Sequence, residues 1–177
     1  MPKLIKDRAV VDDRWTLVRE AASIADLPAD VPVIVPLALW HAQRAVLEVR
    51  GNVGVWLAPN DEPADLAADV AALPVIAVDF PKFGDGRGYS TARLLRERYG
   101  YRGELRAIGD VLRDQLYAMA ECGFDAFCVR EDRDPHDALL GLRVFTGLYA
   151  ATARAPQPWF RRRTAASPAE TAWCPDL

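Results

Sequence analysis

The sequence has little of the residue types that build metal and redox centres. Its 177 residues include three cysteines, Cys122, Cys128 and Cys174, and two histidines, His41 and His136. An odd cysteine count without a C-x-x-C pair argues against a disulfide framework and against a zinc site. Two imidazoles far apart in the chain likewise argue against a histidine-based metal centre, so we expect no bound metal.

Long apolar runs and a strong charge of one sign are also missing. No apolar run approaches the roughly 18 residues that a membrane helix needs, and residues 1–13 lack the apolar segment of a signal peptide. We therefore expect a cytoplasmic protein that does not enter a membrane. The net charge of -3 provides no basic face for nucleic acid, so we expect no nucleic-acid partner.

The composition that is present suits a single folded unit. With 51% hydrophobic and 27% charged residues, the chain fits one globular domain with a core of ordinary size. Residues 1–154 carry regular apolar patterns and are predicted to form a single α/β domain. Residues 155–177 have prolines, a triple arginine and no periodicity, which predicts an extended or partly disordered tail.

Short apolar runs alternate with amphipathic segments through this domain. The predicted strands lie at 31–36, 53–58, 75–80, 104–108 and 126–130, and the predicted helices at 37–49, 62–72, 91–99, 111–122 and 134–151. About five successive βα units predict a parallel sheet with right-handed crossovers. The continuous apolarity of the strands suits a sheet that is covered on both faces. In the first helix, Leu39, Ala42, Val46 and Val49 form the apolar stripe.

Two architectures fit this alternation. One is an open doubly wound sheet, and the other is a partial barrel that resembles a truncated TIM barrel, since a full barrel typically needs about 250 residues. Residues 8–18 predict an N-terminal β-hairpin with a tight turn at Asp12 and Asp13. Such a sheet leaves an edge that a twofold partner could cover, so we expect a homodimer.

Polar residues gather where the predicted strands end, which is where parallel sheets bind ligands. Asp79 and Asp110 are candidate general bases of a catalytic site, and Arg130 ends a third strand. The alternative for Asp110 is that it complements the dipole of the helix that follows. A glycine-rich loop follows the strand at 75–80, and its candidate anion-binding residues are Lys82, Gly84, Asp85, Gly86, Arg87, Gly88 and Ser90.

The glycine-rich loop is predicted to bind a small anion such as phosphate, sulfate or sulfite. Backbone N–H groups at a helix opened by Ser90 and Thr91 would face the anion, with positive charge from Lys82 and Arg87. The alternative is that the three glycines serve the turn alone. Their spacing differs from G-x-G-x-x-G, so a dinucleotide site is not predicted.

Several segments together resemble one bacterial family. They are FPKFGDGRGYS at 80–90, ARLLR at 92–96, GELRA at 103–107 and CGFDAF at 122–127. The chain resembles an uncharacterised family that is labelled as an oxidoreductase of sulfite reduction and is encoded near sulfite reductase. The resemblance implies a role in assimilatory sulfite reduction, with sulfite reductase or its electron donor as a partner.

The residues set limits on what that label can mean. An oxidoreductase needs an electron carrier, and the sequence has no dinucleotide, iron–sulfur or haem motif. No cofactor is evident, although a flavin bound without a conventional motif stays open. We therefore expect an accessory protein of sulfite reduction, with contacts from tail residues such as Trp159 and Phe160. The alternative is a small enzyme that acts on an anionic substrate at the strand ends.

Overall fold

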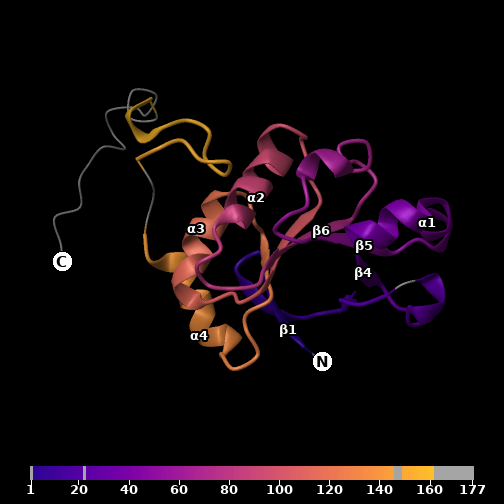
Figure 1. The fold of residues 1–177 in the computed structure, drawn as a ribbon. Helices are drawn as coiled ribbons and strands as arrows, with labels where there is room; N and C mark the ends of the chain where they lie inside the picture. Colours follow the sequence, from indigo (N-terminus) through magenta and orange to yellow (C-terminus); the bar gives the residue numbers. More distant parts are fainter. Residues whose placement is uncertain (1, 22, 146–148, 162–177) are drawn as a thin grey trace.

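A single mixed sheet forms the frame of the protein (Figure 1). The computed structural model describes residues 2–21, 23–145 and 149–161. Within these residues, eight strands lie in the order β2-β1-β8-β7-β6-β5-β4-β3. Their bounds are Lys3–Lys6 (β1), Ala9–Asp12 (β2), Thr16–Leu17 (β3), Val33–Pro36 (β4), Val53–Leu57 (β5), Val75–Phe80 (β6), Glu104–Gly109 (β7) and Ala126–Phe127 (β8).

The parallel part of the sheet follows the order of the sequence. Strands β3 to β8 pair with one another in parallel, each with the next along the chain. The hairpin β1–β2 adds to the β8 edge in antiparallel fashion. The sheet curls into a half-barrel, so the partial barrel is confirmed. A doubly wound sheet is wrong for this chain, because such a sheet reverses its strand order at a switch point.

The helices cover one face of the sheet. They are α1 Leu37–Arg50, α2 Arg87–Glu97, α3 Leu116–Glu121 and α4 Pro135–Leu139, with short 3-10 helices η1 Ile24–Asp26, η2 Pro63–Leu66, η3 Arg113–Gln115 and η4 Leu140–Arg143. Figure 1 shows α2, α3 and α4 together on one side and α1 beside β4 and β5. Buried residues of all four α-helices join one large apolar cluster with the outward-facing strand residues.

The inner face has a separate and smaller apolar cluster that includes no described helical residue. Its buried members are Ile34, Val75, Ala77 and Ile108, and Trp15, Leu17, Trp56 and Cys128 pack against them. The central strands are buried on both faces, as the sequence predicts. On the inner face no described helix provides the cover, because curling brings the inward side chains together and they bury one another.

Several local details differ from the sequence predictions. The hairpin turn lies at Asp7 and Arg8, which both adopt positive φ, and not at residues 12–13. The segment predicted as a helix at 62–72 forms only η2 and turns, because its buried Asp69 is tied to α1 by a 2.8 Å hydrogen bond from Trp40 Nε1. The helix predicted for 134–151 ends as an α-helix at Leu139; residues 146–148 lie outside the described residues.

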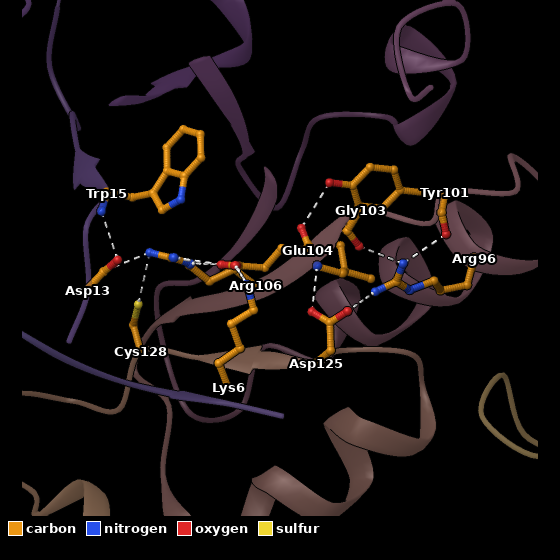
Figure 2. A network of polar contacts seen from close by, with 11 residues as sticks. Lys6, Asp13, Trp15, Arg96, Tyr101, Gly103, Glu104, Arg106, Asp125 and Cys128 are labelled. Carbon is orange, nitrogen blue, oxygen red and sulfur yellow. Dashed lines mark hydrogen bonds and ion pairs between the residues drawn. The ribbon is translucent and has the colours of Figure 1, made fainter. Parts of the chain in front are cut away.

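A buried ionic network closes the inner face at the amino ends of the strands (Figure 2). Arg106 is 1% exposed, and its guanidinium donates to Glu104 Oε1 and Asp13 Oδ2, each at 2.8 Å. Glu104 also accepts a 2.7 Å hydrogen bond from Lys6, which raises the pKa of that ammonium group. Asp13 in turn accepts from the backbone N–H of Trp15. The network thus joins β1, β7 and the segment before β3.

Removing the arginine from this network should be costly. An Arg106→Ala variant leaves Asp13 buried without its cation and Glu104 with Lys6 as its remaining cation, and breaking a buried pair typically costs about 3–5 kcal/mol. Urea denaturation at pH 7 should therefore show a free energy of unfolding lower by about that amount. The exposed pair of Arg93 and Glu97 is the control, since Arg93→Ala should cost less than about 1 kcal/mol. Similar losses in the two variants would contradict the assignment.

Candidate functional site

The carboxyl ends of the central strands surround two adjoining cavities of about 430 and 520 Å³. Both are lined by Arg19, Gly109 and Arg130. Asp79 and Asp110 complete the wall of the smaller cavity, and Leu17, Ile108 and Cys128 supply apolar surface in the larger one. We call Arg19, Asp79, Asp110 and Arg130 the rim site. Carboxyl strand ends are the usual place for ligands in barrels of βα units.

Arg19 enters the rim site from the segment that follows β3. Its guanidinium donates to Asp79 Oδ1 at 2.8 Å and lies over the ring of Trp56, 5.7 Å from the centroid. Trp56 is held in place by a 3.0 Å hydrogen bond from its Nε1 to the carbonyl of Val18. The Asp79 side chain is 9% exposed and that of Arg19 is 46% exposed, so the carboxylate lies beneath and the cation faces outward.

Asp110 connects Arg130 to the glycine-rich loop. Its Oδ1 accepts from Arg130 at 2.8 Å, and its Oδ2 accepts from the backbone N–H of Phe83 at 2.9 Å. Arg130 also forms a two-pronged pair with Asp132 at 2.6 and 3.0 Å. These hydrogen bonds to Asp132 and Asp110 raise the pKa of Arg130. Asp110 therefore holds Arg130 and the backbone of Phe83 in place, and this positioning role is separate from a role as general base.

Two small features complete the geometry of the rim. Gly109 has φ of 95°, and a Cβ there would lie 2.4 Å from the carbonyl oxygen of Phe80, so only glycine fits between β6 and β7.

Burial raises the pKa of the Cys128 thiol to about 11. A thiol with that pKa is almost entirely protonated at neutral pH, which argues against a nucleophilic role for Cys128.

The glycine-rich loop lies beside the rim site, outside the walls of these two cavities. Its main internal contact is the ion pair of Asp85 and Arg87, at 2.6 Å, and Arg87 also donates to the side chain of Asn60. Helix α2 begins at Arg87, so the prediction that Ser90 and Thr91 open it is wrong. Lys82 and Ser90 are exposed. Anion binding by this loop stays a prediction.

The structure thus divides the predicted site residues into two groups. Asp79, Asp110 and Arg130 come together as expected, whereas Lys82, Asp85, Arg87 and Ser90 belong to the neighbouring loop. Arg19 was missed, because the predicted hairpin placed residues 14–18 beside residues 8–11. If residues 14–18 are instead taken as a strand that joins the parallel sheet, Arg19 follows the carboxyl end of that strand and becomes a candidate.

A comparison with protein families identifies the chain. Residues 54–160 match the model of a family described as "Bacterial protein of unknown function (DUF934)". The chain belongs to this family. The match includes Asp79, Asp110, Arg130 and the glycine-rich loop of the DUF934 protein, while Arg19 precedes it. A search of curated proteins found no match. The family description names no reaction, so it leaves the sulfite role as a proposal.

Metal-ligand groups and membrane-spanning helices were sought among the described residues of the DUF934 protein. The described residues contain no group of three or more His, Cys, Asp or Glu side chains that could hold a metal ion. None of the helices in residues 2–21, 23–145 and 149–161 is long and apolar enough to cross a membrane.

Two glycines of the loop should respond differently to substitution. In Gly88→Ala the new Cβ would lie 2.6 Å from Cζ of Phe80, and overpacking of this kind costs about 1–3 kcal/mol. Gly86 has φ of -86° with nothing within 4 Å of a Cβ, so Gly86→Ala should change stability by less than about 1 kcal/mol. Thermal and urea unfolding of both variants provides the measurement. Equal destabilisation would show that the packing of Gly88 on Phe80 is not what requires glycine.

Proposed function

We propose that this DUF934 protein binds a small oxyanion at the rim site and acts as an accessory protein of sulfite reduction. The observation that carries the proposal is that Arg19 and Arg130, which are far apart in the sequence, line the same cavities at the carboxyl ends of the strands. Guanidinium groups match oxyanions in geometry, because they donate parallel N–H groups from one plane. A convergent pair is a recognised way to hold such an anion.

The existing ion pairs orient both cations, and they leave donors open on Arg19 but not on Arg130. Among the described residues Arg19 donates one hydrogen bond, from a terminal nitrogen to Asp79, and its side chain is half exposed. An oxyanion accepts from the outward side of this guanidinium. Arg130 uses all three nitrogens on Asp110 and Asp132, so it contributes mainly its charge. Arg19 is therefore the principal ligand-binding residue.

The nature of the anion is suggested by the family resemblance. Sulfite is a small, doubly charged oxyanion whose oxygens suit guanidinium donors. The chain has no conventional cofactor motif, so electrons for reduction come from the partner, sulfite reductase or its electron donor. A flavin remains a second route, and a yellow colour of the purified protein would favour it. The loop at 82–90 lies next to the rim and is a second candidate position for the same anion.

A second candidate function is a small enzyme that acts on an anionic substrate. It is favoured by the position of Asp79, whose buried carboxylate faces the smaller cavity beside Arg19. Asp79 or Asp110 would serve as general base, and the arginines would hold the substrate. Both carboxylates already accept hydrogen bonds from arginine, which weakens this candidate relative to binding alone. Chemical conversion of the bound anion by the purified protein would favour it.

Loss of Arg19 should weaken anion binding. A charged hydrogen bond contributes about 1.5–3 kcal/mol, so Arg19→Gln should raise the dissociation constant for sulfite by about 10- to 100-fold. Isothermal titration calorimetry with sulfite, sulfate and phosphate is the measurement. Arg14→Gln is the matched control, since Arg14 is exposed and lines neither rim cavity. Arg87→Gln separates the two positions: a loss confined to this variant would place the anion at the loop and overturn the rim assignment.

Docking on sulfite reductase should depend on exposed aromatic residues near the end of the described chain. Phe160 is 54% exposed, and aromatic side chains are favoured anchors at interfaces. The full chain should retain purified sulfite reductase in a pull-down, and Phe160→Ala should weaken the affinity at least about tenfold. Phe83→Ala is the control, because Phe83 is 53% exposed on the loop beside the rim. Failure of the unmodified chain to retain the reductase would refute the accessory role.

A further inference from the structure

A third cavity, of about 480 Å³, lies at the opposite end of the strands from the rim site. Its walls include the β1–β2 turn at Asp7 and Arg8, and Asp125 just before β8. The backbone N–H of Asp7 donates to the carbonyl of Asp125, which places the turn beside the amino end of β8. We call this space the amino-end cavity. The rim proposal does not involve it.

We infer that the amino-end cavity binds an anion that carries an apolar ring or chain. Two features of the cavity lining lead to this assignment. One is a set of arginines, Arg8, Arg102 and Arg154, which we call the polar side, and the other is an apolar part of the lining, which we call the floor and which includes Phe124, Phe127 and Leu142. The ligand's charged group binds at the arginines, and its apolar part lies on the floor.

The walls of the cavity are held in place by the protein's own contacts. Arg96 donates to the carbonyls of Gly123, Tyr101 and Gly103 at 2.8–2.9 Å and to the carboxylate of Asp125 at 2.7 Å. Figure 2 shows this guanidinium with Tyr101, Gly103 and Asp125. All three of its nitrogens are engaged, so Arg96 forms a fixed wall. A ligand must therefore be recognised by other cations.

The opposite wall comes from the segment that follows the last helices. Thr152 is buried, and its hydroxyl donates to Glu121 Oε2 at 2.7 Å. The backbone N–H of Ala153 donates to the carbonyl of the same glutamate at 3.1 Å. These two bonds tie the segment to the end of α3 and bring Arg154 to the edge of the cavity. The space is thus bounded by anchored elements on both sides.

The arginines on the polar side carry positive charge that the protein neutralises only in part. Arg8 and Arg102 are exposed, and neither forms an ion pair or a side-chain hydrogen bond with another described residue. The carboxylate nearest to Arg154 is Glu121, at 3.9 Å. Of the acids in the wall, Asp125 pairs with Arg96 and Glu97 pairs with Arg93. The carboxylate of Asp7 also lines the cavity, but it cannot balance three cations.

The floor explains why a bare inorganic anion is a poor match. Phe124 and Phe127 are 3% and 2% exposed, and the surface that they keep accessible lines the cavity. A hydrated sulfate would leave this surface in contact with water. A carboxylate, sulfonate or phosphate attached to a ring or chain covers the apolar floor and places its charge at the arginines, as ligand cavities commonly require.

The test uses anilinonaphthalene sulfonate, an aromatic anion whose fluorescence rises in apolar surroundings, with the full chain. The double variant Arg8→Gln/Arg102→Gln should raise its dissociation constant at least tenfold, because both unpaired guanidinium groups are lost. Arg14→Gln should bind like the unmodified chain. Far-UV circular dichroism and the urea midpoint must agree among the three proteins, so that the fluorescence reports the native cavity and not partly folded chain.

Two further measurements make the result decisive. Phenylnaphthylamine, which has the same rings without the sulfonate, should bind at least tenfold more weakly than the anion. Backbone amide shifts in NMR should move at Phe124 and Phe127 on addition of the anionic probe, and not at Ile108 and Gly109 of the rim. Equal binding by the double variant, equal binding of the neutral probe, or shifts confined to the rim would each overturn the assignment without affecting the rim proposal.

Discussion

The buried guanidinium of Arg106 is the constraint on which the inner face of the half-barrel depends. A charge removed from water is tolerated only when oppositely charged partners surround it with good hydrogen bonds. Glu104 and Asp13 meet that requirement, and Lys6 balances the second carboxylate in turn. Because these residues come from β1, β7 and the segment before β3, the network ties distant parts of the chain to one register.

The two ends of strand β7 differ in character: the amino end carries buried charges and the carboxyl end leads into the rim site. Every second residue of β7, namely Glu104, Arg106 and Ile108, lies on its inner face, and Asp110 follows its carboxyl end. The amino end of the strand is therefore ionic and buried, its middle is apolar, and its exit is polar and accessible. This is the usual division in sheets of βα units, where the carboxyl ends carry ligands and the amino ends carry stability. The amino-end cavity departs from that rule, since its unpaired arginines face solvent.

Strong local patterns predicted the central part of the fold and brought together three of the residues that line the rim cavities. The apolar run at 75–80 gave β6 with its bounds correct, and the polar residues at the strand ends gave Asp79, Asp110 and Arg130. Weak local signals failed. Strand β3 has two residues, too few for a periodic pattern, so Arg19 was missed. The hairpin turn uses Asp7 and Arg8 at positive φ, and arginine stands at the second position, where sequence rules expect glycine.

Tertiary contacts account for the errors within correctly predicted elements. Helix α1 was expected, but Val46 and Val49 of its predicted apolar stripe are exposed, and Leu47 is buried instead. The backbone leaves helical geometry at Gln43, whose side chain accepts a hydrogen bond from the N–H of Ile24. This break rotates the second half of the helix relative to the first, so a single helical period could not describe both halves. Similarly, only packing on Phe80 distinguishes Gly88 from Gly86.

The edge strands of the sheet are too short to be good binding surfaces for another chain. The edge strands β3 and β2 have two and four residues, and short edges offer few backbone groups for pairing with another chain. The expected homodimer stays a prediction, but edge-to-edge pairing is a poor basis for it. The described residues instead expose large apolar side chains in the last part of the chain, namely Val144, Phe145, Tyr149, Trp159 and Phe160. A second copy or a reductase would therefore bind more stably by packing on these side chains than by pairing with an edge strand.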